Sequence, residues 1–259
     1  MPDPQQGLTD DLGRDLRLSL PARSVISLCP SITETVAALA PESLQGRTRY
    51  CIHLASIQTV PEFGGTKNPR IDAILQARPD LLIAEKEENR PEDVAALEAQ
   101  IPVYVFDVCQ IDDALQMIQR LGVLLGRAEQ ASDLLQRVQR AWQPLRGSRG
   151  PERVLYLIWR KPWMGVGAGT YIHSVLDWLG YQNVLAEEQR YPSLDLEQIR
   201  DLKPQRILLS SEPYPFTEEH ARELRAALPG VCVDCVDGEA YSWYGVRMLH
   251  AAATFSQSR

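Results

Sequence analysis

Several aromatic side chains fall in turn-rich segments, and some of them flank basic residues. Trp159 and Trp163 stand on either side of Arg160, and Tyr244 directly follows Trp243. Large flat rings beside a positive charge suit a bulky planar ligand with acidic or amide groups, through stacking, cation–π contacts and hydrogen bonds. The predicted ligand contacts are Tyr50, Trp159, Arg160, Trp163, Tyr191, Trp243 and Tyr244. Taken singly, each ring is better explained by packing at the end of a folded lobe, whereas taken together their places in loops suit a binding groove as well as packing.

Two histidines, His53 and His173, stand near these aromatic segments. A neutral imidazole is a common metal ligand, so either residue could coordinate a metal at the centre of a bound chelate. The chain has four histidines, and none pairs with another at a spacing typical of a metal cage. His220 is expected on a solvated helix face. The identity of a metal ligand therefore stays open between His53 and His173.

Catalysis has weaker support in the sequence. Cys51 and His53 could form a nucleophilic pair, but alternate residues seldom meet, and no carboxylate is evident that would orient the imidazole. We therefore expect no catalytic residue and no catalytic cofactor. The enzyme alternative is a metal held by His53, Cys51 or His173 that performs hydrolytic or redox chemistry.

Cys232 and Cys235 form a C-x-x-C pair inside an apolar segment that is typical of a strand. Residues three apart on a strand point to opposite faces, which disfavours a shared metal or a redox turn. We expect both to be small buried hydrophobic residues. All five cysteines are expected as reduced thiols, because a chain of this length needs no disulfides.

Two further motifs concern the backbone. The glycine-rich residues 165–169 lead into a helix expected to start near Thr170, but they lack the spacing of a dinucleotide fingerprint and the lysine of a P-loop. They predict a turn with close backbone approach. Ser31 and Glu34 have the spacing of a capping box, which would start a helix and could expose its terminus to an anionic ligand group.

Short apolar runs alternate with amphipathic segments along most of the chain, which is typical of α/β folds with parallel sheets. The predicted strands are residues 25–28, 81–84, 103–106, 154–158, 207–209 and 231–233. We expect two parallel, Rossmann-like sheets, each covered by helices.

A repeat supports two similar lobes. A helical run, a basic residue, proline and an apolar strand occur at residues 71–83 and again at 196–209. Proline must end the helix in both copies, and the next residues suit a buried strand. Asp72 and Glu197 occupy equivalent positions in the two copies, so each lobe carries one carboxylate.

Residues 111–146 contain no strand pattern, but their apolar residues have helical spacing, which predicts a long connecting helix. The Gly- and Pro-rich residues 147–151 would end it. The expected organisation is an N-terminal α/β lobe at 22–126, a connecting helix at 127–147 and a C-terminal lobe at 151–259. The groove between two such lobes is the natural ligand site, and a rigid connection would permit only small opening motions.

Composition narrows the function. The chain has 259 residues, 44% of them hydrophobic, and a net charge of −7 without a basic run, which argues against nucleic-acid binding. No stretch is long enough to span a membrane, and we expect a monomer. The first twenty residues lack a signal-peptide pattern, so we expect a cytoplasmic location for the chain as written, or periplasm or cell surface for a processed or truncated form.

Five motifs resemble those of a known family, the cobalamin and iron-siderophore substrate-binding proteins of ABC importers, also called the helical-backbone metal receptors. They are residues 25–34 (VISLCPSITE), 49–51 (RYC), 64–69 (GGTKNP), 78–81 (RPDL) and 242–245 (SWYG). Within this family the motifs resemble those of the vitamin B12 binders.

This resemblance implies a class III periplasmic-binding-protein fold, with two α/β lobes bridged by one long α-helix. It implies a transport function without catalysis, in which cobalamin or a related corrinoid or metal chelate is the ligand. By the same resemblance Asp72 and Glu197 match the acidic residues that dock the ABC permease. An iron-siderophore or haem receptor is the alternative, and a cytosolic corrinoid or metal-chelate sensor is a second.

Overall fold

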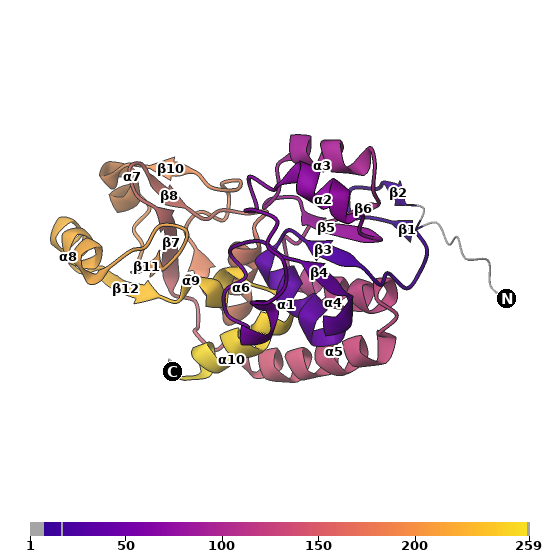
Figure 1. Cartoon of the computed structure of the whole chain (residues 1–259). Helices are drawn as coiled ribbons and strands as arrows, with labels where there is room; N and C mark the ends of the chain where they lie inside the picture. Colours follow the sequence, from indigo (N-terminus) through magenta and orange to yellow (C-terminus); the bar gives the residue numbers. More distant parts are fainter. Residues whose placement is uncertain (1–7, 17, 258–259) are drawn as a thin grey trace. The chain divides into compact units, whose positions relative to one another are not determined.

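The structure is a computed structural model that describes residues 8–16 and 18–257. It consists of two compact units (Figure 1). Within the described residues, unit 1 comprises 8–16, 18–108, 112–138 and 244–247, and unit 2 comprises 109–111, 139–243 and 248–257.

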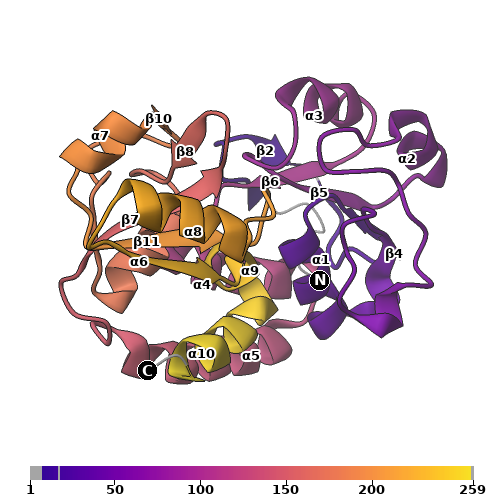
Figure 2. The ribbon, with the colours of Figure 1, turned by 90° about the vertical axis from the view of Figure 1, so that its left-hand side faces the viewer.

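Unit 1 is built on a four-stranded parallel sheet in the order β4-β3-β5-β6. Its strands are β3 (Val25–Ser27), β4 (Leu44–Gly46), β5 (Leu81–Glu85) and β6 (Val103–Phe106). The strands are apolar on both faces because helices cover both. On one face α2 (Ile71–Ala77) and α3 (Pro91–Glu98) pack on the sheet, and α1 (Pro30–Leu39) and α4 (Ile111–Leu124) lie on the other (Figures 1 and 2).

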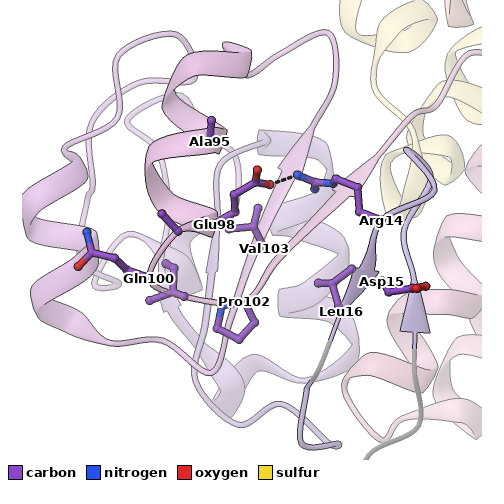
Figure 3. A pocket seen from close by; sticks show the side chains of 10 residues that line it. Arg14, Asp15, Leu16, Ala95, Glu98, Gln100, Pro102 and Val103 are labelled. Atoms are coloured by element: carbon purple, nitrogen blue, oxygen red, sulfur yellow. Dashed lines mark hydrogen bonds and ion pairs between the residues drawn. The ribbon is translucent and has the colours of Figure 1, made fainter.

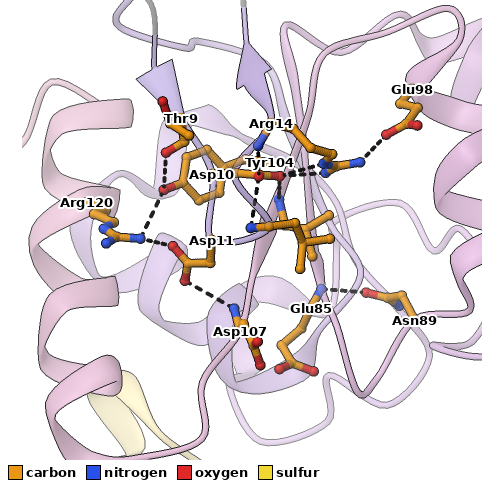
Figure 4. Close-up of polar contacts among 12 residues, drawn as sticks. Thr9, Asp10, Asp11, Arg14, Glu85, Asn89, Glu98, Tyr104, Asp107 and Arg120 are labelled. Atoms are coloured by element: carbon orange, nitrogen blue, oxygen red, sulfur yellow. Dashed lines mark hydrogen bonds and ion pairs between the residues drawn. The ribbon is translucent and has the colours of Figure 1, made fainter.

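An N-terminal hairpin covers the edge strand of this sheet. It consists of β1 (Leu8–Thr9) and β2 (Asp15–Leu16), and its turn reaches β6 (Figure 4). Asp11 N–H donates to Val105 O at 3.2 Å, and Val105 N–H donates to Asp10 Oδ2 at 3.2 Å. Arg120 pairs with Asp11. The hairpin therefore occupies backbone groups that an edge strand would otherwise expose to another chain.

Unit 2 contains a mixed sheet in the order β10-β8-β7-β11-β12, with β9 paired to β7. Its strands are β7 (Arg153–Trp159), β8 (Trp163–Gly165), β9 (Gln182–Asn183), β10 (Ser193–Leu194), β11 (Arg206–Ser210) and β12 (Cys232–Val236). The β7, β9, β11 and β12 pairings are parallel, as expected, whereas β8 and β10 pair antiparallel. The second sheet is therefore not purely parallel. Only a short turn separates β8 from β7, and two strands joined in this way must pair antiparallel.

Helices cover both faces of the second sheet as well. Leu155 and Ile207 pack with α7 (Leu196–Asp201) and α8 (Glu218–Ala227) in one core. On the other face Tyr156 contacts Tyr241 with ring centroids 5.0 Å apart. The remaining helices of unit 2 are α6 (Tyr171–Leu179), α9 (Gly238–Ser242) and α10 (Met248–Gln257), and the short 3-10 helices of the chain are η1 (Pro41–Ser43), η2 (Ala55–Ile57), η3 (Gln143–Leu145) and η4 (Gly245–Arg247).

The structure confirms the six predicted strands and the repeat. In both copies the basic residue before proline has a left-handed backbone at or just after the end of the helix, with φ 47° for Arg78 and 48° for Lys203. The N–H of the residue after proline then donates a hydrogen bond to the start of an earlier strand of the same unit. Asp80 N–H donates to Ser24 O, just before β3, at 2.8 Å, and Gln205 N–H donates to Arg153 O, at the start of β7, at 2.9 Å. The two units therefore share a helix–proline–strand element down to single hydrogen bonds.

The helical region between the sheets differs from the single helix expected over 111–146. It forms two helices, α4 and α5 (Ala128–Trp142), separated at residues 125–127. Gly126 has φ +64°, a conformation that glycine adopts without strain and that ends a helix. Helix α5 belongs to unit 1 as far as Val138 and to unit 2 from Gln139 onward.

Two local predictions were wrong. Helix α1 has Cys29 as its N-cap and Pro30 in its first turn, so Ser31 lies inside the helix and no capping box forms there. Cys232 and Cys235 lie on a strand as predicted, but both are exposed. They are exposed because β12 ends the sheet, where one edge has no neighbouring strand among the described residues.

Within residues 8–16 and 18–257, no helix combines the length and the apolar character that a membrane span requires.

Candidate functional site

Parallel strands bring their following loops to one edge of a sheet, called the carboxyl edge below. In unit 1 this edge carries the loops after β3, β4 and β5, and in unit 2 the loops after β7, β11 and β12. Tyr50 lies in the loop after β4, and Trp159 is the last residue of β7. Trp243 instead follows α9 and is linked to this edge by its hydrogen bond to Glu212, which comes just after β11. Topology therefore places Tyr50 and Trp159, and a tertiary contact places Trp243.

In unit 1 one buried amide joins three segments at this edge. The Asn89 side chain donates to Thr66 O at 2.9 Å and to Leu28 O at 3.3 Å, and it accepts from Glu85 N–H at 2.8 Å. Asn89 is only 3% exposed. Because all three partners are backbone groups, the amide fixes the loops after β3 and β5 against the turn at residues 64–69.

That turn also supports Tyr50. A Cβ atom at Gly65 would lie 3.1 Å from the Tyr50 ring and 2.4 Å from Asn68 Oδ1, so only glycine allows this close approach. Arg49 N–H donates to Gly64 O at 2.9 Å and ties the loop to the turn. The ring itself is 51% exposed. Tyr50 thus rests on a backbone platform and presents an open aromatic surface.

Below this edge lies a buried group of ionisable side chains. Glu85 is 2% exposed and accepts Glu87 N–H at 2.7 Å and Glu88 N–H at 2.8 Å. Burial raises the pKa of Glu85 to about 8. Burial also raises the pKa of the Cys29 thiol to about 12, and it raises the pKa of Tyr244. These groups favour their uncharged forms in the folded protein.

Tyr244 belongs to this buried group. It is 6% exposed, and its hydroxyl lies 3.6 Å from Cys29 Sγ. The next residue, Gly245, has φ +71°, and a Cβ there would lie 2.1 Å from Thr35 Oγ1. The segment is therefore packed tightly against α1, and a role for Tyr244 as a ligand contact stays a prediction.

In unit 2 Trp159 ends β7 and is 41% exposed. Its ring meets Tyr214 edge-on, with centroids 5.6 Å apart. Arg160 pairs with Glu223 at 2.5 Å, and its guanidinium lies 5.5 Å from the centre of the Trp163 ring. The cation expected to meet the ligand is therefore held in place by an acidic partner and an aromatic face.

The remaining predicted contacts of unit 2 have different surroundings. Trp243 Nε1 donates to Glu212 Oε1 at 2.9 Å, which anchors the indole at the carboxyl edge. Trp163 is 8% exposed and stacks on Phe216 in the core, with ring planes 6° apart. Tyr191 is half-buried. Its neighbour Pro192 accepts a hydrogen bond from Gly165 N–H at 3.0 Å, and Gly165 pairs with Leu157 of β7. Tyr191 therefore lies beside β8, level with the middle of β7.

The histidines do not converge. His53 is exposed, and His173 is half-buried with Nδ1 3.0 Å from Asn183 Nδ2. Within the part of the chain that the structure describes, no three His, Cys, Asp or Glu side chains group as a metal site would require. His220 was expected on a solvated face, but it is half-buried among Tyr214 and Phe216.

Two cavities of the structure lie away from these contacts. One of about 730 Å³ in unit 1 is bordered by the N-terminal hairpin, the end of α3 and the start of β6 (Figure 3). One of about 690 Å³ in unit 2 is lined by Tyr181, Arg206 and Tyr241 among others. Neither includes a predicted ligand contact.

Asn89 and Glu212 were missed at the sequence level. Each lies within a few residues of the end of a buried strand, and a polar residue in that loop is the only signal the sequence offers. Such signals are weak, because loops after strands are polar in most proteins.

Comparisons with known proteins concern the family and the fold of the chain. Residues 25–226 match the family model described as "Periplasmic binding protein". The vitamin B12-binding protein of Vibrio cholerae serotype O1 is 27% identical over 207 residues, which cover 78% of this chain and 72% of that protein. The crystal structure of the periplasmic vitamin B12 binding protein BtuF of Vibrio cholerae is similar with a TM-score of 0.76 and 25% identity, over 92% of this chain and 96% of that one.

A third similar structure is the periplasmic heme-binding protein RhuT from Roseiflexus sp. RS-1. It has a TM-score of 0.76 at 20% identity and covers 92% of this chain and 99% of its own. At this identity the likeness concerns the fold alone.

Proposed function

Because the chain belongs to the periplasmic binding protein family, we propose that it is the substrate-binding component of an ABC-type importer and that its ligand is vitamin B12 or a related corrinoid. The observation that carries this proposal is the set of anchored aromatic residues at the carboxyl edges. Tyr50 rests on Gly65, and Trp243 is fixed by Glu212. The similarity to vitamin B12-binding proteins supports the choice of ligand.

The chemistry of these residues suits a corrinoid. Rings whose orientation is fixed lose little conformational entropy when a planar ligand stacks on them, so more of the contact energy contributes to affinity. Carboxyl edges of α/β sheets are where such folds bind small molecules. A binding role also needs no converging acid and base, and none was predicted.

Cyanocobalamin should bind the purified protein with a dissociation constant in the micromolar range or tighter. Tyr50→Ala and Trp243→Ala should each weaken binding by about 30-fold, because an aromatic anchor that the ligand covers contributes about 2 kcal/mol. Isothermal titration calorimetry measures both. Trp178→Phe is the control, since Trp178 packs against Trp142 in unit 2 and should leave the affinity unchanged.

Absence of corrinoid binding, with tight binding of haemin in the same assay, would contradict the corrinoid assignment. The family assignment would then stand with a different ligand.

We also propose that Asp72 and Glu197 dock the permease. Both are exposed and lie in the first turns of equivalent helices, α2 and α7. Asp72→Lys or Glu197→Lys should reduce vitamin uptake more than tenfold while the dissociation constant for cyanocobalamin stays unchanged, because a lost interfacial charge pair typically costs 2–5 kcal/mol.

The measurement is uptake of labelled cyanocobalamin by cells whose importer depends on this chain as its binding protein. Asp201→Lys is the control, because Asp201 is an exposed acid at the other end of α7. Equal uptake by wild type and both reversed variants would show that docking uses another surface.

A further inference from the structure

Tyr214 lies in the loop after β11, at the carboxyl edge of unit 2, and its contact with His220 has a defined direction. Thr217 N–H donates to His220 Nδ1 at 3.0 Å, so this nitrogen is an acceptor. A neutral imidazole then carries its hydrogen on Nε2. Nε2 lies 3.2 Å from the Tyr214 hydroxyl and donates to it.

Arg160 also lies beside Tyr214: its pKa is raised mainly by the hydrogen bond with Glu223 and to a lesser extent by Tyr214. The hydrogen bond from His220 occupies one lone pair of the phenol oxygen. The contacts that Tyr214 makes with described side chains use its oxygen and its ring face, and its O–H hydrogen is left to point elsewhere.

The surroundings make this hydrogen a fixed donor. Arg160 is held by Glu223 at 2.5 Å, and the Tyr214 ring packs on Phe216 with centroids 4.8 Å apart. The neighbouring Trp159 ring is 41% exposed. An oriented hydroxyl donor beside an open aromatic face can recognise an oxygen acceptor on the rim of a flat ligand.

We propose that Tyr214 is a specificity-determining residue that donates a hydrogen bond to a carbonyl or carboxylate oxygen at the rim of the ligand's ring system. This inference rests on the proposed function, and it adds a residue that the sequence did not single out as a contact. Both amide side chains of a corrinoid and propionates of a haem present such an oxygen. His220 then acts as a positioning residue, which orients the phenol.

The test removes the hydroxyl alone. Tyr214→Phe should weaken cyanocobalamin binding about tenfold in calorimetric titration, which corresponds to one hydrogen bond of about 1.4 kcal/mol. Tyr181→Phe is the matched control, because Tyr181 is a half-buried tyrosine of the same unit that lines the separate cavity described above. Haemin serves as the second probe, so that a selective loss identifies the acceptor as amide or carboxylate.

A second variant separates recognition from structure. His220→Ala removes the bond that orients the phenol but keeps the hydroxyl, so its loss of affinity should be smaller than that of Tyr214→Phe. Equal losses in the two variants, together with equally lowered melting temperatures, would assign Tyr214 a purely structural role and overturn the proposal.

The remaining outcomes are distinct. Unchanged affinity of Tyr214→Phe for both probes, in a protein whose wild type binds them, would overturn this inference and leave the proposed function intact. A wild type that binds neither probe would overturn the proposed function and this inference with it.

Discussion

Truncating Trp142 to alanine should lower the free energy of unfolding by about 3–5 kcal/mol, the range for a large aromatic residue removed from a core. Trp142 ends α5 and is 1% exposed. Its Nε1 donates to Met248 O at 2.7 Å, and its ring meets Phe255 edge-on with centroids 6.0 Å apart. Truncation would therefore open a cavity and leave a buried carbonyl without its donor.

Urea unfolding followed by circular dichroism measures this loss. Trp142→Phe should cost less, about 1–3 kcal/mol, because the ring volume is largely kept and only the hydrogen bond to Met248 is lost. Trp178→Ala is the control, since Trp178 is half-buried and should cost less than Trp142→Ala. A loss below about 2 kcal/mol for Trp142→Ala would mean that the site collapses around the missing ring.

Replacing Glu85 by glutamine should remove much of the decline in stability that the wild type shows as pH rises from about 5 to 8. An unfolded glutamate has a pKa of about 4.3. In the fold, burial raises the pKa of Glu85 to about 8, with the carboxylates of Glu88 and Glu87 adding to the effect. The fold thus favours the protonated form of Glu85. The stability that protonated Glu85 contributes is fully present below the pKa of the unfolded state and is lost as the pH approaches 8.

The measurement is the free energy of unfolding of both proteins at several pH values between 4.5 and 9. The difference between Glu85→Gln and wild type isolates this residue from other titrating groups. Glu92→Gln is the control, because Glu92 is an exposed acid in the first turn of α3 and should follow the wild-type profile. Parallel profiles for wild type and Glu85→Gln would show that Glu85 is ionised without cost in the fold.

The strands and the repeat could be predicted because their signals are local. The short apolar run at residues 103–106 is typical of a buried strand. Pro79 and Pro204 mark the ends of the helices before them, because proline cannot continue a helix. A lobe boundary was predicted at 126/127, but the end of one helix and the start of another there were not, since the apolar spacing continues on both sides of Gly126. The antiparallel return of β8 was missed because it depends on pairing with β7.

Part of the candidate site was also predictable. Tyr50, Trp159 and Trp243 follow strand-like segments, and aromatic residues at such places favour a binding role. Their supports could not be predicted. Glu212 is 31 residues from Trp243, and nothing in the sequence indicates that the two side chains meet.

The sequence by itself thus determined the α/β class, the two equivalent helix–proline–strand elements and the set of candidate aromatic contacts, because each follows from neighbouring residues. Only the tertiary structure decided which rings are open and which are buried. Trp159 and Trp163 are four residues apart and of the same type, yet one is 41% exposed and the other 8%. The difference arises because Trp163 lies on a strand covered by Phe216, a residue 53 positions later in the chain. Burial and hydrogen-bond partners depend on residues distant in the chain, and no local pattern records them.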